Sequence, residues 1–213
     1  MSETSFDFNV FIKESKDVLI TPKSFFSMMK TTGGIAEPLI KALIYGAVAG
    51  IIAFIWSLLN IRSGTAGLIG SGVGIMIIVG YIIGAVIGLF IGADILFVIS
   101  TICKGNVDFE ANMRVIASVL VLLPISALLG FISEFSYIAG VIVGLALNIF
   151  ALYLLYHGLV EALKANQGTS KIVIYILAGL LVIITLVGMI AKNRVVGRMD
   201  TDLKELMQDM QNK

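Results

Sequence analysis

An almost unbroken apolar run from Ala66 to Cys103 limits the possible folds of this chain more than any other feature. A helix needs about 20 residues to cross the hydrocarbon core of a bilayer. If the whole run were one helix, it would reach about 57 Å, nearly twice the roughly 30 Å core. We therefore predict a membrane span that begins around residues 72–75, with part of the run tilted, bent or projecting from the membrane.

The composition extends this interpretation to the whole chain. Hydrophobic residues make up 58% and charged residues 14%, and the mean hydropathy is +1.02. Together these values indicate an all-α, polytopic membrane protein, a helical bundle. The net charge of +1 offers no basic field for nucleic acid. A single cysteine and a single histidine provide neither an internal disulfide nor a metal-ligand cluster, so no metal and no cofactor are predicted.

Five transmembrane helices are predicted from the apolar runs. A cytoplasmic amphipathic tail over 1–38 precedes the membrane domain over 39–192, and a short charged tail follows over 193–213. The predicted spans are about 39–61, 74–103, 115–132, 137–157 and 172–191. Counting lysine and arginine in the short segments places the N-terminus in the cytoplasm and the C-terminus outside. The basic residues of the C-terminal tail oppose that orientation.

The N-terminal tail carries two helix signals. Apolar residues fall on one face at helical spacing between Phe8 and Leu19. Thr21 and Pro22 then form a second helix start, with proline at the first helical position. We predict interfacial helices here. The sequence leaves open whether their apolar faces lie in the headgroup layer or pack against the protein itself.

Glycines at four-residue spacing mark several spans. In lipid, small residues let helix backbones approach closely, and packing drives association. We therefore predict helix contacts at these positions, within the bundle or between protomers, and a homo-oligomer is one outcome. The glycines are Gly80, Gly84, Gly88 and Gly92 in the second span, Gly46 and Gly50 in the first, and Gly140 and Gly144 in the fourth.

A polar centre is predicted from three residues in different spans. Asp94 is the ionisable side chain deep within an apolar run, where a carboxylate is costly unless it is paired, protonated or hydrated. Asn148 in the fourth span and Pro124 in the third lie at a similar depth, about 14 to 15 Å from the same membrane edge for Asp94 and Asn148. We predict that Asp94 meets Asn148 in the bundle core, near the carbonyl freed by Pro124, as a neutral clasp or as an ion site.

Three segments resemble the Ypt-interacting (YIP) family of five-span membrane proteins. They are "TPKSFF" before the first span, "ICKGNVDFEANMRVIASVLVLLPI" entering the third, and "LYLLYHGLVEALKANQGTSKIVIYIL" leaving the fourth. The resemblance implies a cytoplasmic N-terminus, five helices and no enzymatic chemistry. Eukaryotic members are associated with small GTPases and vesicle traffic, and are thought to shape or organise membranes.

The chain departs from the eukaryotic members in one respect. It lacks their long hydrophilic N-terminal region with its aspartate, leucine and glycine-proline motif, so a small GTPase partner is not carried over. It resembles the short prokaryotic members instead, which implies a multi-pass protein of the cell inner membrane.

Two functions remain after enzymes are set aside, because the chain has no HExxH motif and no paired carboxylates in its spans. The first is membrane organisation or scaffolding through the glycine faces, with the lipid bilayer as partner. The second is a small channel or permease for a proton, a cation or a small solute, which would use Asp94 and Asn148.

Overall fold

The computed structural model describes residues 7–59 and 74–211, and side-chain surroundings as far as residue 191. Every regular element in these ranges is helical, which confirms the predicted all-α class. Five helical segments are long and apolar enough to cross a membrane, as predicted. They are Ala36–Leu58, Gly74–Ile102, Phe109–Phe135, Tyr137–Ala162 and Gln167–Ala191.

The chain forms two units, Met1–Tyr175 and Ile176–Lys213. The first contains α1 (Phe8–Ile20), α2 (Pro22–Met28), α3 (Ala36–Leu58), α4 (Gly74–Ile102), α5 (Phe109–Val119), α6 (Leu122–Leu129), α7 (Ile132–Phe135), α8 (Tyr137–His157), the π-helical η2 (Gly158–Ala162) and the start of α9 (Gln167–Gln211). The second unit is the remainder of α9 and the chain end. Its residues from Ile176 to Ala191 complete the fifth apolar segment.

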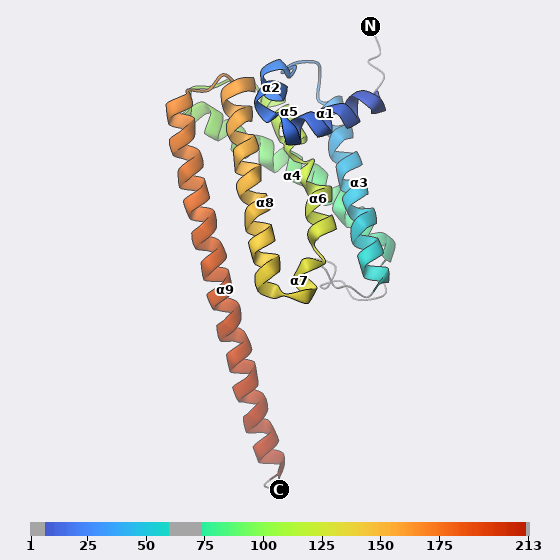
Figure 1. The fold of residues 1–213 in the computed structure, drawn as a ribbon, viewed down its shortest axis with the longest axis vertical. Helices are drawn as coiled ribbons and strands as arrows, with labels where there is room; N and C mark the ends of the chain where they lie inside the picture. Colours follow the sequence, from blue (N-terminus) through green and yellow to red (C-terminus); the bar gives the residue numbers. More distant parts are fainter. Residues whose placement is uncertain (1–6, 60–73, 212–213) are drawn as a thin grey trace. The chain divides into compact units, whose positions relative to one another are not determined.

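Within the first unit, α3, α8 and the α5–α6–α7 segment run between the same two ends, and α4 crosses them obliquely (Figure 1). At 1.5 Å per residue, the 29 residues of α4 span about 43 Å, which is longer than the roughly 30 Å hydrocarbon core. The oblique course is one way to fit such a length into a bilayer. Residues 66–73, which the sequence also places in the long apolar run, lie outside the described ranges.

The core of the first unit forms where α3, α4 and α5 meet. Five fully buried side chains pack together there: Ala42, Leu89, Ala93, Met113 and Ala117. Small residues on α3 bring the two backbones close, because a Cβ added to Gly50 would lie 2.8 Å from Ile78 Cα. This is the close packing that small residues allow between membrane helices.

The third span is broken where the sequence places Pro124. Proline has no backbone N–H and cannot donate to the carbonyl of Leu120, four residues earlier. Helix α5 ends at Val119, and Leu123 N instead donates to Leu120 O at 2.9 Å in a tighter turn. Helix α6 then starts at Leu122. The kink expected from proline is therefore present.

This span also begins earlier than its apolar stretch suggests. The prediction treated 104–114 as a polar loop, whereas α5 starts at Phe109, capped by the Asp108 side chain, which accepts from Glu110 N. The polar residues Asn112 and Arg114 are buried in it. They are tolerated because their donors are paired within the protein, which a hydropathy pattern does not register.

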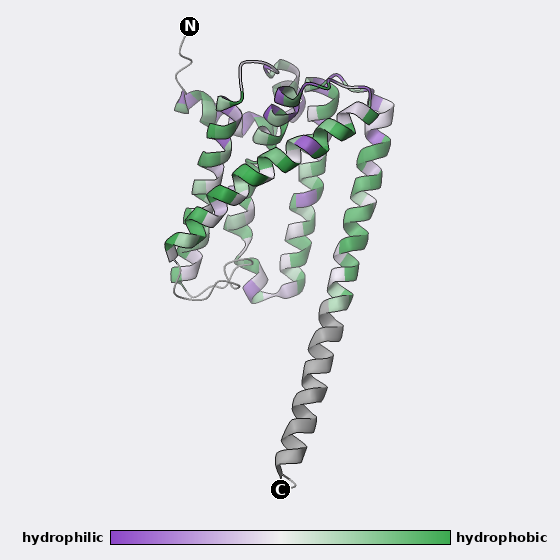
Figure 2. Cartoon of the chain, turned by 180° about the vertical axis from the view of Figure 1, so that it is seen from behind, coloured by the Kyte–Doolittle hydropathy of each residue, from purple (hydrophilic) through white to green (hydrophobic). Residues whose placement is uncertain are grey.

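Helices α1 and α2 lie across one end of the first unit (Figure 1). Hydropathy colouring shows polar residues gathered around this end, and apolar residues along the lengths of the spans (Figure 2). One face of α1 and α2 packs against the protein through buried Phe11, Val18, Phe25 and Phe26. The other face exposes Phe8, Ile12, Ile20 and Met28. Packing against the protein, one of the two alternatives left open by the sequence, is therefore present on one face of these helices, and contact of the other face with the headgroup layer stays a prediction.

Candidate functional site

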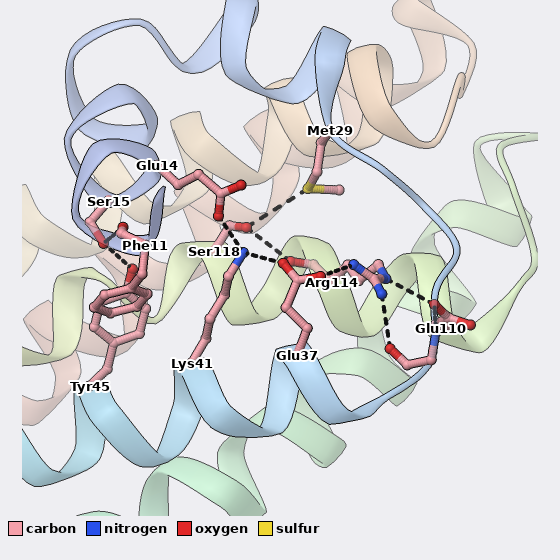
Figure 3. A network of polar contacts seen from close by, with 11 residues as sticks. Phe11, Glu14, Ser15, Met29, Glu37, Lys41, Tyr45, Glu110, Arg114 and Ser118 are labelled. Carbon is pink, nitrogen blue, oxygen red and sulfur yellow. Dashed lines mark hydrogen bonds and ion pairs between the residues drawn. The ribbon is translucent and has the colours of Figure 1, made fainter. Parts of the chain in front are cut away.

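Arg114 is the centre of a charge network where α1, α3 and α5 converge (Figure 3). Its guanidinium is 6% exposed. Its Nη1 lies 2.7 Å from Glu37 Oε2 on α3, and its Nε lies 2.9 Å from Glu110 Oε1 on α5. Its Nη2 donates to the carbonyl of Gly34 at 2.9 Å. All three nitrogens of the buried guanidinium are therefore engaged, two of them by carboxylates.

Lys41 extends the network to α1. Its buried ammonium lies 2.7 Å from Glu14 Oε2 on α1 and 2.9 Å from Glu37 Oε1, one turn earlier on α3. Glu37 thus uses one oxygen for Lys41 and the other for Arg114. The bridge matters because an isolated charge would be costly at such buried positions, whereas a paired one is tolerated.

The segment between α2 and α3 is held by the same residues. Gly34 N donates to Glu110 Oε1 at 2.7 Å, while Gly34 O accepts from Arg114. Gly33 and Gly34 have φ values of 135° and 92°, which side-chain-bearing residues rarely adopt. A Cβ added to Gly33 would also lie 2.9 Å from Arg114 Nη2. The glycine pair therefore lets the backbone reach the guanidinium.

A second contact fixes α1 to α3 next to this network. The hydroxyls of Ser15 and Tyr45 are 2.7 Å apart, and the rings of Phe11 and Tyr45 pack with centroids at 5.0 Å. The hydroxyls of Ser15 and Tyr45 thus face each other beside the charge network. The arrangement holds the N-terminal helices on the spans, and it presents no converging set of free polar groups for a substrate.

The sequence signal for this network was present but incomplete. Glu37 and Lys41, and likewise Glu110 and Arg114, are four residues apart, a spacing that pairs opposite charges on a helix. These two pairs could have been found from the sequence. Their connection through Glu37 and Arg114 joins residues 77 positions apart, which no local pattern indicates.

The predicted Asp94–Asn148 pair is not formed in the structure. Both side chains are exposed. The Asn148 amide donates to the Gly144 carbonyl in its own helix at 2.8 Å. No described residue forms a hydrogen bond or ion pair with Asp94, and Pro124 lies in the broken third span. Within the single chain, the two side chains therefore do not form the buried centre that the sequence predicts.

Asp94 instead shares the exposed face of α4 with part of the glycine series. At about 100° per residue, it lies about 40° from Gly80 around the helix axis. Gly80, Gly84 and Gly88 are exposed, and a Cβ added to any of them would meet no atom within 4 Å. We call Gly80, Gly84, Gly88 and Asp94 the α4 face. Figure 2 views the first unit from the side on which α4 crosses in front of its other spans.

The other glycines differ in their surroundings. Four-residue steps advance about 40° beyond a full turn, so Gly92 rotates into the bundle, where an added Cβ would lie 3.0 Å from Ile116 Cγ2. Gly140 packs against Ser133, whereas Gly144 is open. Gly46 and Gly50 both pack against the α4 backbone. Contacts within the bundle therefore exist at some predicted positions, and are absent at Gly80, Gly84, Gly88 and Gly144 among the described residues.

No group of three or more histidine, cysteine, aspartate or glutamate side chains that could hold a metal occurs within 7–59 and 74–191. With this geometry in place, comparison with known proteins gives one match. The model of the family described as the Yip1 domain matches residues 16–190. No curated protein and no solved structure matches the chain.

Proposed function

Since this chain belongs to the Yip1 domain family, we propose that it is a non-enzymatic membrane-organising protein whose copies associate through the α4 face. It is an integral membrane protein with five apolar helices. The observation that carries the proposal is the open space above Gly80, Gly84 and Gly88, on a helix that is otherwise apolar. Bare glycines in lipid permit close backbone approach by another helix.

Asp94 also favours a partner helix that covers this face. A carboxyl in contact with acyl chains is costly, and it is stabilised by a hydrogen-bond partner from another helix. Most homodimers are two-fold symmetric, so the same face meets itself. In such a dimer the partner's α4 would cover Asp94 and supply polar groups to its carboxyl.

Transport through a central polar site has less support. Its two candidate residues, Asp94 and Asn148, are exposed and separate. The charged residues of the Arg114 network are occupied by one another. A pathway would need polar side chains facing a common interior, and the described spans do not supply one through these residues.

The self-association proposal predicts that Gly84→Leu and Gly88→Leu weaken dimerisation. Each added side chain meets open space in the single chain, so the fold should be kept, but it would separate two helices that meet at this face. We expect a loss of about 1 to 3 kcal/mol of association free energy, which raises the dimer dissociation constant roughly fivefold to 150-fold. Energy transfer between labelled copies diluted in liposomes measures this constant.

Gly179→Leu is the matched control, because Gly179 on α9 also has no atom within 4 Å of an added Cβ. It should leave the dissociation constant unchanged. Wild-type protein that stays monomeric on concentration in the bilayer, or α4 variants that dimerise like wild type, would contradict the proposal.

Flux measurements separate the proposed function from transport. Liposomes containing the wild-type protein are expected to hold proton and monovalent-cation gradients as well as protein-free liposomes do. The gradients can be followed with a pH-sensitive dye and a potassium-sensitive dye. A flux that appears with the wild-type protein and disappears with Asp94→Leu would overturn the scaffold assignment in favour of a channel or permease.

A further inference from the structure

Two loops at the same end of the first unit pair with each other through reciprocal backbone hydrogen bonds. One loop joins α4 to α5, and the other joins η2 to α9. Asn106 N donates to Leu163 O at 2.7 Å, and Asn166 N donates to Cys103 O at 2.8 Å. Each loop therefore gives and receives one bond at an equivalent position, although about 60 residues separate them in the chain.

The paired loops share a residue order. Lys104-Gly105-Asn106 matches Lys164-Ala165-Asn166, and each lysine lies between the carbonyl that accepts and the asparagine that donates. The loops are tightly packed, because a Cβ added to Gly105 would lie 2.9 Å from Ala165 Cβ. The backbones of Lys104 and Lys164 are thus held near each other by the paired loops.

Both lysines adopt a backbone conformation that normally selects glycine. Lys104 has φ 55° and Lys164 has φ 56°, and they are the two residues other than glycine with positive φ in the described ranges. The left-handed residue that ends a helix is usually glycine or asparagine. Non-glycine residues held in this region cluster at ligand-binding sites, where the surrounding structure maintains them.

Several polar groups around the two lysines are already occupied. Asn106 O accepts from both Ser100 Oγ and Asn112 Nδ2, and Asn166 Oδ1 accepts from Thr169 N. Asp108, the carboxylate of the first loop, accepts from Glu110 N. Both lysines are exposed, and neither ammonium forms an ion pair or hydrogen bond with a residue described by the structure.

We propose that Lys104 and Lys164 together bind the headgroup of an anionic phospholipid. One loop follows the apolar α4, and the other precedes the apolar part of α9. Both loops therefore lie at the depth of the lipid headgroups. Two neighbouring ammonium groups favour a headgroup with net negative charge, because a zwitterionic headgroup brings its own cation. The site is separate from the α4 face and does not depend on the proposed self-association.

The double variant Lys104→Gly with Lys164→Gly tests the site with little risk to the fold, because glycine adopts positive φ without strain. The protein is placed in nanodiscs of phosphatidylcholine, with or without phosphatidylglycerol, and bound phosphatidylglycerol is counted by native mass spectrometry. We expect the variant to melt at or above the wild-type temperature in phosphatidylcholine. Its affinity for phosphatidylglycerol should fall about tenfold to thirtyfold, because the loss of each lysine lowers the affinity roughly fivefold.

A charge-matched control is Lys13→Gln with Lys16→Gln, which removes two exposed lysines from α1. It should retain most of the affinity for phosphatidylglycerol. An equal loss in the control, or an unchanged affinity in the loop variant, would overturn the proposal. Inorganic phosphate added to phosphatidylcholine nanodiscs distinguishes the source of the anion: stabilisation by phosphate that the loop variant lacks would assign the site to a soluble anion rather than to a lipid.

Discussion

Replacing Arg114 with leucine is expected to lower the free energy of unfolding by about 3 to 5 kcal/mol. The change removes the cation that holds Glu37, Glu110 and the Gly34 carbonyl together. Glu110 is then left in a partly buried position with the Gly34 N–H as its remaining bond to that loop. Unfolding by sodium dodecyl sulfate in mixed micelles, followed by circular dichroism, measures the loss.

Lys30→Leu is the control for this result, since it also removes one positive charge but from an exposed position. It should change the free energy of unfolding by no more than about 0.5 kcal/mol. If Arg114→Leu were as stable as Lys30→Leu, the network would not be what holds α3, α5 and the Gly33–Gly34 segment together.

Gly50→Leu is expected to destabilise the bundle by about 1 to 3 kcal/mol or more. The new Cβ would lie 2.8 Å from Ile78 Cα and 3.1 Å from Ile78 O, so the obstacle is the backbone of α4, which cannot rotate away. The two helices have to separate, and the core at Ala42, Leu89 and Ala93 opens with them. The same detergent titration reports the change.

Gly84→Leu provides a sharp comparison, because it makes the same chemical change on the partner helix where nothing lies within 4 Å. It should leave the stability of the monomer close to that of wild type. Equal destabilisation by the two substitutions would mean that the backbones of α3 and α4 are farther apart at Gly50 than the structure shows.

The spans were predictable because each is a hydrophobic run bounded by turn or charge signals. The fourth predicted span, 137–157, coincides with α8, and the break at Pro124 follows from the missing N–H. The start of the third was not predictable from hydropathy. Arg114 marks the membrane edge in a hydropathy pattern, but pairing with Glu37 and Glu110 places it inside the folded unit.

The candidate site was predicted less well, for a geometric reason. Depth along a helix can be counted from the sequence, which is how Asp94 and Asn148 were matched. The direction that each residue faces depends on how the helices are rotated against one another. Asn148 satisfies its amide within α8, and Asp94 lies on the outward face of α4. The Gly80–Gly92 series likewise divides between an open face and the Ile116 contact.

The attachment of α1 and α2 has a consequence for the bilayer around the protein. These helices make the first unit wider at one end, whereas the described part of the opposite end carries only the short α7 (Figure 1). In a bilayer, the exposed apolar side chains of these helices would occupy area in one leaflet and not in the other. Because Lys41 and Tyr45 bind α1 to α3, the difference in occupied area between the two leaflets is fixed by the fold. Under the proposed function, each molecule would act as a fixed wedge, and the bending of the bilayer would increase with the number of molecules gathered in one patch.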